Sequence, residues 1–586
     1  MCGLAGIMMA GGPPPEAALA AMDKALAHRG PDGRGRYLAG NLGMVHVRLA
    51  IIDLETGDQP IREPEGAALV ANAEIYNYLE LRQELTGVAF ATNSDCEPPL
   101  HLYRRLGAGF AEKLRGMYAI AIHDAVNNRL LLARDPFGIK PLYYAETTNC
   151  FAFASEPQAL IAAGIVAPRL NPQRRLELLQ LQFTTGDETL FEGIRRVAPG
   201  ETLVVAGGRV IERRRRHALP RSAPRVEDEE TALNRIDAAL EDSVRVHQRC
   251  DVPYGMFLSG GIDSTAILAM MARLNDRPVR AFTAGFSGTR VADERAHARL
   301  MAESLGAEHV EVEFSEDDFW TLLPAVAAAM DDPAADYAVL PTYKLASVAK
   351  QELKVVLCGE GGDEMFAGYG RYRSVMRPWW AGGRALRPRG LLEGTGVLRA
   401  DQPSWRDGIA AAEINAALPN RTRLQVAQAT DCADWLPNDL LIKLDRCLMA
   451  HGVEGRTPFL DPVVADAAFR LPDSLKIRKG LGKWLLREWL ARQLPEAKPF
   501  SRKRGFTVPV GQWIARRGKA LGELVAEEPG VAQVCRPEAV RRLFESGGRH
   551  AGLACWVILF YALWHRRHIL GLDPAGDVIE TLAQRG

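Results

Sequence analysis

Over roughly the first 210 residues, apolar and polar positions alternate in short runs separated by turn residues, a pattern typical of β-strands. Helical spacing interrupts the strands at residues 15–30 and 77–87, and the second helix runs into a glycine suited to a helix C-terminus. We therefore predict a strand-rich domain with flanking helices over residues 2–211. The predicted strands cover residues 41–54, 67–77, 117–124, 128–135 and 150–155.

Beyond residue 230 the pattern changes to helices that alternate with short apolar strands. Such alternation predicts a parallel sheet with helices on both faces. After about residue 365 the spacing is mostly helical, so we expect an α/β domain with a helical extension over residues 231–586. The predicted strands lie at residues 252–258, 279–286, 308–314 and 353–359, and the helices at 231–249, 264–275 and 294–306.

Residues 212–230 contain a run of arginines, two prolines and a run of acids without apolar periodicity. This composition predicts a linker between the two domains. Four consecutive arginines would suit a contact with nucleic acid, but the acidic run beside them favours a solvated surface.

Composition narrows the choice of partners. The 586 residues include 72 basic and 72 acidic side chains, so no overall charge attracts nucleic acid or a membrane, and small molecules are the expected partners. Nine cysteines without a CxxC pair fit a reducing compartment. The chain shows no signal peptide, and the apolar run at 554–564 is too short to span a bilayer. We therefore expect a cytoplasmic enzyme in which this run forms a buried helix.

Cys2 follows the initiator methionine, and removal of Met1 would leave a free α-amine beside the thiol. Such an amine has a pKa of about 7.7–8.0, so it can accept the thiol proton near neutral pH. Most cysteines are simply small buried apolar residues, so Cys2 is a candidate nucleophile only if partners for it occur elsewhere.

Two glycine-rich loops follow predicted strands of the second domain. In residues 257–268 a strand, two glycines and a helix start predict a cradle for phosphate, with Asp263 available for Mg²⁺. The GxxxxGK[ST] motif is absent from the sequence, so transfer of a γ-phosphate is not implied. The second loop, at 357–372, places Glu360, Asp363 and Glu364 among glycines at the end of a strand, where open parallel sheets bind ligands.

Residues 259–264, SGGIDS, resemble the pyrophosphatase loop of enzymes that cleave ATP between its α- and β-phosphates. Together with Cys2, motifs along nearly the whole chain resemble glutamine-hydrolysing asparagine synthetases of the bacterial B type. The resemblance implies an N-terminal-nucleophile glutaminase with a four-layer αββα fold, joined to an adenylating α/β domain. The matching motifs lie at residues 1–7, 28–35, 47–54, 71–77, 94–97, 115–122, 134–144, 257–266, 355–369, 436–461 and 483–490.

The resemblance assigns roles in the glutaminase site. Cys2 is the implied nucleophile, and Asn72 with the backbone N–H of Ala73 forms the implied oxyanion hole. Arg48 is expected to grip the glutamine carboxylate and Asp95 its α-amino group, with Glu74 as a supporting contact. Leu49, Ala50, Ile51 and Ile52 complete the implied glutamine-binding set.

In the synthetase site, the family activates the β-carboxylate of aspartate as an acyl-adenylate that ammonia attacks. Glu360 is the implied catalytic carboxylate, and Lys483 is implied to offset charge at the α-phosphate. A lone lysine at a helix start is usually solvated, so the role of Lys483 depends on the resemblance. Asp263 and Asp363 are the implied Mg²⁺ contacts. The implied ATP-binding residues are Leu258, Ser259, Gly260, Gly261, Asp263, Ser264, Ala284, Cys358 and Gly359.

Residue 73 departs from the family pattern, because Ala73 stands where the family has glycine. If the glycine is used for a positive φ, an alanine there costs roughly 1–2 kcal/mol. We therefore expect a modest glutaminase defect that glycine would repair.

The resemblance implies synthesis of asparagine from aspartate, ATP and glutamine, with ammonia passing through an interior tunnel. An amidotransferase of the same architecture acting on another carboxylate stays open, because the acceptor pocket cannot be read from sequence. Retention of Cys2 disfavours a ring-closing relative such as a β-lactam synthetase. The intact set of site residues disfavours a regulatory protein with inactive sites. A homodimer is the assembly that the family often forms.

Overall fold

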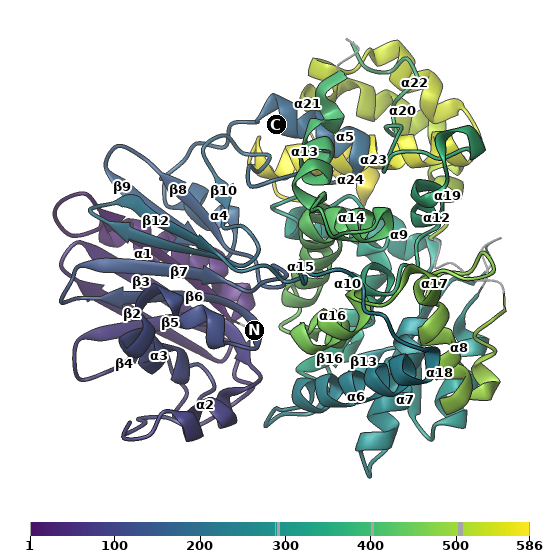
Figure 1. The fold of residues 1–586 in the computed structure, drawn as a ribbon. Coiled ribbons are helices and arrows are strands. Elements are labelled where there is room, and N and C mark those ends of the chain that lie inside the picture. The colour runs from purple at the N-terminus through teal and green to yellow at the C-terminus, as the bar shows by residue number, and fades with distance from the viewer. Residues whose placement is uncertain (1, 288, 290–292, 400–402, 502–507, 585–586) are drawn as a thin grey trace.

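The computed structural model describes residues 2–287, 289, 293–399, 403–501 and 508–584. Figure 1 shows two halves side by side: a strand-rich N-terminal half in purple and blue, and a larger half, mainly in teal, green and yellow, that carries most of the helices. The N-terminus lies on the face of the first half that is turned toward the second. This arrangement confirms the predicted mixture of a β-rich domain and a helical α/β domain.

The N-terminal half is a sandwich of two antiparallel six-stranded sheets. Alternate residues of β1 and β5, such as Leu4 and Val70, fill the space between the sheets. The outer faces are covered by α1 and α4 on one sheet and by α2 and α3 on the other, which gives four layers. The first sheet has the order β10(Arg195–Arg196), β8(Tyr143–Glu146), β9(Cys150–Ala154), β1(Gly3–Met9), β3(Leu42–Arg48), β2(Gly33–Ala39), and the second β12(Arg209–Arg215), β11(Glu201–Ala206), β7(Arg129–Arg134), β6(Gly116–Asp124), β5(Ala67–Ile75), β4(Ile61–Arg62).

The arginine run that we predicted as the start of a linker belongs partly to this sandwich. β12 extends to Arg215, and Arg213 donates to Glu201 at 2.8 Å. Its last four residues, 212–215, are all charged and its two apolar residues, Val210 and Ile211, are adjacent, so no apolar alternation marked the strand in the sequence. Its charges are suited to an edge strand, because they discourage pairing with another sheet.

The second half contains a parallel sheet of five strands. The chain enters at the centre in β13, builds outward through β14 and β15, and then crosses to β16 on the other side. The loops after β13 and β16 therefore meet at the point where the strand order reverses, the usual ligand site of such sheets. The order is β15(Glu308–Glu313), β14(Arg280–Gly285), β13(Tyr254–Phe257), β16(Val355–Leu357), β17(Glu454–Arg456).

Strand β17 was not predicted, because its three residues lie in a region of helical spacing and two of them are charged. Both charges are buried, and Arg456 Nε donates to Glu454 Oε1 at 2.7 Å. Charge neutralisation of this kind lets a polar segment occupy a sheet edge inside the protein.

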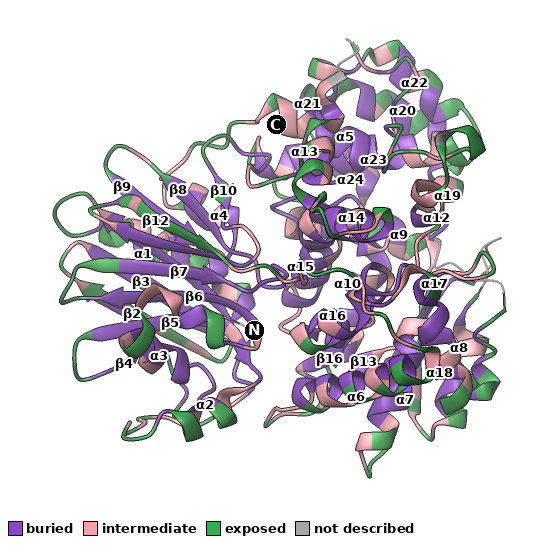
Figure 2. Ribbon diagram, in the orientation of Figure 1, coloured by how far each residue is buried: buried purple, intermediate pink, exposed green. Residues whose placement is uncertain are grey.

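Helices surround the parallel sheet and build the C-terminal extension. The apolar run at 554–564 lies in α23, where its residues are buried as predicted (Figure 2). No helix in the described ranges is long and apolar enough to cross a membrane. The α-helices are α1(Glu16–Leu26), α2(Tyr78–Glu84), α3(Pro98–Leu106), α4(Pro157–Ala162), α5(Pro172–Leu181), α6(Glu229–His247), α7(Ile262–Leu274), α8(Arg295–Ser304), α9(Glu316–Ala329), α10(Val339–Ala349), α11(Gly362–Met365), α12(Gly370–Met376), α13(Asp407–Ala416), α14(Arg423–Thr430), α15(Leu441–Met449), α16(Pro462–Phe469), α17(Asp473–Lys476), α18(Trp484–Gln493), α19(Val510–Arg516), α20(Gly518–Glu527), α21(Pro529–Val534), α22(Pro537–Glu545), α23(Arg549–His568) and α24(Val578–Ala583).

A buried network of charges joins the two halves. Arg29, which is fully buried, forms a bidentate pair with Asp445 of α15 at 2.8 and 2.9 Å and also donates to Glu156 at 2.7 Å. Arg446 donates to Asp445 and Asp331, both at 2.8 Å. Asp445 is thus shared by two guanidinium groups that have little access to water.

Replacing Asp445 by alanine should destabilise the protein by about 3–5 kcal/mol, because it leaves two buried guanidinium groups without their shared carboxylate. The measurement is the shift in thermal unfolding of Asp445→Ala. Asp466→Ala is the control, because Asp466 pairs with Arg225 at the surface, with its side chain 46% exposed. Equal shifts in the two variants would contradict a special role for the buried network.

Candidate active sites

The first candidate site surrounds Cys2, immediately before β1. Its backbone nitrogen donates to Asn72 Oδ1 at 3.0 Å, and its Sγ lies 3.9 Å from the carbonyl of Leu49. The carbonyl oxygen of Cys2 accepts from Arg29 Nε at 3.1 Å. Burial raises the pKa of the Cys2 thiol. Hydrogen bonds to its backbone N and O atoms therefore fix the position of Cys2.

Two hydrogen-bond donors lie on β5 beside this cysteine. Asn72 is completely buried, and its Nδ2 has no hydrogen-bond partner among the residues that the structure describes. A buried amide donor of this kind is expected to bind a polar ligand. Along the same strand Ala71 N donates to Gln59 Oε1 and Ile75 N to Asp95 Oδ2. Because amides alternate in direction along a strand, the N–H of Ala73 points to the same side of β5 as those of Ala71 and Ile75.

The structure corrects our expectation for Ala73. This residue lies inside β5 and is not among the non-glycine residues with positive φ. The strain that we expected from replacing glycine is therefore absent, because an extended strand accepts alanine freely.

The expected glutamine-binding residues lie around these donors but differ in their contacts. Arg48 at the end of β3 pairs with Asp58 at 2.8 Å and donates to the carbonyl of Ile52. Leu49 and Ile51 are buried in a cluster that includes residues of the second half, and Ala50 N donates to Asp32. The segment 48–52 is thus fixed along its whole length.

The two expected acidic residues have different surroundings. Asp95 is buried beside Ile75, and burial raises the pKa of its carboxyl to about 6. Glu74 instead forms an ion pair with Arg456 of β17 at 2.7 Å. Glu74 therefore connects the cysteine site to the second domain.

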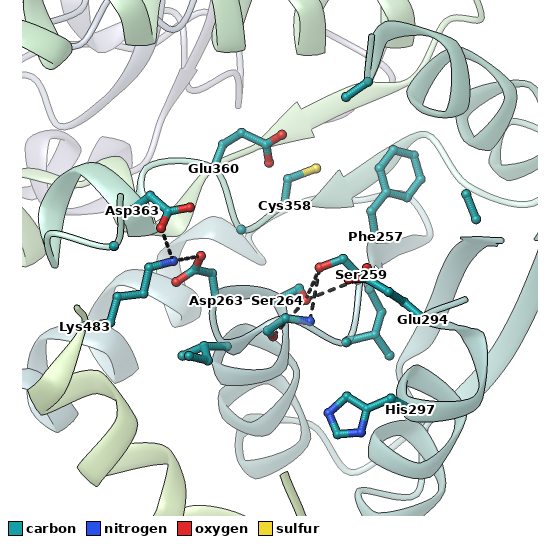
Figure 3. Close-up of a pocket in the computed structure, with 18 of the residues that line it drawn as sticks. Phe257, Ser259, Asp263, Ser264, Glu294, His297, Cys358, Glu360, Asp363 and Lys483 are labelled. Atoms are coloured by element: carbon teal, nitrogen blue, oxygen red, sulfur yellow. Dashed lines mark hydrogen bonds and ion pairs between the residues drawn. The ribbon is translucent and has the colours of Figure 1, made fainter. Parts of the chain in front are cut away.

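The second candidate site is a cavity of about 850 Å³ at the reversal point of the parallel sheet. It lies between the loops after β13 and β16, with α8, α10 and α15 around it. Figure 3 shows Ser259, Asp263 and Ser264 from one loop opposite Glu360 and Asp363 from the other. All of the expected ATP-binding residues line this cavity: Leu258, Ser259, Gly260, Gly261, Asp263, Ser264, Ala284, Cys358 and Gly359.

The loop after β13 has the form of an anion cradle. Gly260 has φ +67°, a conformation that favours glycine, and a Cβ there would also be crowded at 3.2 Å from Ala298 N. Ser259 and Ser264 join their hydroxyls at 3.1 Å, which closes the loop. Helix α7 begins directly after Gly261, so its first amides face the cavity, where an anion is favoured.

Lys483 lies between the two acidic residues that we expected to contact a metal. Its ammonium forms ion pairs with Asp263 and, at 2.7 Å, with Asp363 (Figure 3). Burial opposes the charge, but these two carboxylates raise the pKa of Lys483. A lysine at a helix start is usually solvated, whereas Lys483 is only 3% exposed. The fold therefore gives this residue an electrostatic role that the helix start alone did not predict.

Sequence comparisons identify two domains in this chain. Family models for asparagine synthase and for a glutamine amidotransferase domain match residues 235–566 and 1–215. A putative asparagine synthetase [glutamine-hydrolyzing] of Mycobacterium bovis is 35% identical over 96% of this chain and 97% of its own. Asparagine synthetase [glutamine-hydrolyzing] 1 of Bacillus subtilis is 31% identical over 97% of each chain. The chain belongs to the asparagine synthase family.

Within this asparagine synthase family member, two functional candidates were not assigned from the sequence. Arg29 lies in the motif at residues 28–35 and Lys443 in the motif at 436–461, and both motifs carried the resemblance. Lys443 lines the cavity, where its Nζ lies 3.2 Å from Asp336 Oδ2 and 4.0 Å from Glu360 Oε1. Burial raises the pKa of Glu360, and the charge of Lys443 opposes that rise. Motif membership was the signal that could have identified both residues.

Restoring glycine at residue 73 tests the geometry of the cysteine site. Because Ala73 is already in an extended strand, Ala73→Gly should leave kcat/KM for glutamine hydrolysis unchanged within about twofold and should lower strand stability by roughly 0.5–1 kcal/mol. Steady-state release of glutamate and urea unfolding are the two measurements. A tenfold gain in hydrolysis would show that alanine does displace the amide.

Proposed function

We propose that this chain makes L-asparagine from L-aspartate and ATP, with ammonia released from glutamine at Cys2. The observation that carries the proposal is that one chain holds both a cysteine beside buried amide donors and an anion cradle at a parallel-sheet reversal. Helix α15 borders both sites. Its Asp445 contacts Arg29, which donates to the carbonyl of Cys2, and its Lys443 lines the cavity. An amidase of Gibberella zeae is also 33% identical over 60% of this chain and 55% of its own, so other acceptors belong in any substrate test.

At the first site, the Cys2 sulfur attacks the side-chain amide carbon of glutamine. The negative oxygen that forms is stabilised by Asn72 Nδ2 and the N–H of Ala73. The α-amine of Cys2, free once Met1 is removed, takes the thiol proton and passes it to the amide nitrogen, so the C–N bond breaks and ammonia leaves. Water then hydrolyses the thioester to glutamate. Arg48 binds the glutamine carboxylate and Asp95 its ammonium, while Glu74 holds the strand in place through Arg456. The segment 49–52 forms the wall beside the substrate.

At the second site, a carboxylate oxygen of aspartate attacks the α-phosphorus of ATP and pyrophosphate leaves. Ammonia then attacks the acyl carbon, and AMP leaves with the bonding electrons. Ser259, Gly260, Gly261 and Ser264 cradle the phosphates, Lys483 offsets charge at the α-phosphate, and Glu360 accepts the proton lost by ammonia. Leu258, Ala284, Cys358 and Gly359 contact the nucleoside.

The pair Asp263 and Asp363 fits Mg²⁺. Both carboxylates already converge on one cation, the ammonium of Lys483. No cluster of three protein ligands occurs in the part of the chain that the structure describes. A pair of carboxylates suits a Mg²⁺ site that substrate phosphates complete. When bound, the ion would neutralise charge on the departing pyrophosphate.

Within this proposal, residues 2–215 form the glutaminase domain and residues 229–586 the synthetase domain. The boundaries follow the end of β12 and the start of α6 rather than the predicted linker of 212–230. The homodimer implied by the resemblance stays a prediction.

Replacing the nucleophile separates the two reactions. Cys2→Ala should abolish amide formation from glutamine, because no thioester can form, while ammonium salts still support it. The measurement combines glutamate, AMP and pyrophosphate release with identification of the amide product, for a panel of carboxylates. ADP in place of AMP would contradict the adenylate. Loss of the ammonium-dependent reaction in Cys2→Ala, with the fold intact, would contradict separate chemistry.

The pKa of Asp95, about 6, predicts how glutamine binding depends on pH. The ionised carboxylate binds the substrate ammonium, so binding is strong above this pKa and is lost as protonation neutralises the group below it. The KM for glutamine should therefore rise about tenfold from pH 7 to pH 5. In Asp95→Asn the KM should be high and flat over this range. If the KM of Asp95→Asn also rose about tenfold as the pH fell, the pH dependence would belong to a group other than Asp95.

A further inference from the structure

The part of the cavity beside Glu360 is built differently from the phosphate loop. Lys443 of α15 and Asp336, which precedes α10, face each other there at 3.2 Å. Both residues line the cavity, and the side chain of Lys443 is only 7% exposed. Asp336 uses its other oxygen, Oδ1, to accept from Ala338 N at 3.0 Å. Its carboxylate is therefore oriented by the start of α10, with Oδ2 turned to Lys443.

The two buried lysines of the cavity differ in how they are neutralised. Lys483 is in ion-pair contact with two carboxylates, Asp263 and Asp363. Lys443 makes one hydrogen bond to Asp336, and its next carboxylate, Glu360, is 4.0 Å away, beyond hydrogen-bond distance. A lysine ammonium has three N–H donors, so Lys443 retains capacity for a further anion.

The charges around Lys443 also restrict which anion can bind. The carboxylates of Asp336, Glu360 and Asp439 all act on its ammonium and raise its pKa. An anionic ligand that contacts Lys443 must therefore approach several acidic groups. A ligand that carries its own cation relieves this repulsion, because the cation can pair with Asp336 while the anion pairs with Lys443.

We propose that Asp336 and Lys443 form the acceptor subsite, in which Asp336 binds the α-ammonium of an amino acid and Lys443 its α-carboxylate. The substrate adds to the internal ion pair: its carboxylate accepts from the remaining N–H donors of Lys443, and its ammonium donates to Asp336. Glu360 lies 4.0 Å from Lys443, so an amino acid bound here is adjacent to the residue that we propose accepts the proton of ammonia. The proposal of this subsite rests on the proposed function. It assigns the selection of the acceptor to Asp336 and Lys443.

Aspartate analogues that lack one group each provide the test. Succinate lacks the ammonium and β-alanine lacks the α-carboxylate, and both retain the carboxylate that would react. The experiment measures the KM of L-aspartate and the inhibition constants of both analogues in ammonium-dependent synthesis. The variants are Asp336→Asn and Lys443→Gln. The control is Lys350→Gln, because Lys350 is exposed just beyond α10.

Asp336→Asn should raise the KM of L-aspartate and the inhibition constant of β-alanine at least ~10-fold, as expected for loss of one charged hydrogen bond, without weakening succinate. Lys443→Gln should weaken L-aspartate and succinate by a similar factor but change β-alanine less than about twofold. The KM of ATP should change little in either variant, and Lys350→Gln should match the wild type.

Equal weakening of all three ligands in both variants would overturn the subsite, because it would indicate general damage to the cavity. If Lys443→Gln does not fold, the contrast between β-alanine and succinate in Asp336→Asn decides the question alone. Failure of the proposed function gives a different result. In that case the wild-type enzyme itself would form no amide from L-aspartate, and calorimetry would detect no binding of it in the presence of ATP.

Discussion

The buried guanidinium of Arg29 fixes the two halves of the chain to each other. It holds the carbonyl of Cys2 on one side and both oxygens of Asp445 on the other. A charge with no access to water must keep its partners, so neither the nucleophile nor α15 can shift without breaking strong interactions. The position of the cysteine is therefore set by the second domain as well as by its own strand.

Helix α15 extends this constraint to the cavity. Asp445 and Arg446 face the interface, while Lys443 and Leu444 line the nucleotide site. Because a helix turns once every 3.6 residues, neighbouring positions point to different sides. A single rigid element thus borders both candidate sites. Ammonia is mostly protonated in water at neutral pH, so under the proposed function a buried route between the sites would protect its reactive form.

Both sites contain hydrogen-bond donors that the backbone holds in fixed positions. Beside the cysteine, β5 carries the side-chain amide of Asn72 and the backbone N–H of Ala73. In the cavity, the loop at Gly260 and the start of α7 present backbone amides. Under the proposed function, both arrangements place fixed dipoles where negative charge would develop, and such dipoles need no reorganisation during the reaction.

The sequence alone determined the parts of this protein that depend on local pattern. Apolar alternation located most strands, and the glycine loops with Asp263 and Glu360 were readable because short motifs encode their own backbone shape. The tertiary structure alone decided the arginine strand β12 and the charged strand β17, since neither has apolar periodicity. It also decided the extended conformation of Ala73 and the pairing of Lys443 with Asp336. These features arise from contacts between distant segments, and no local pattern of residues records which charges will be buried together.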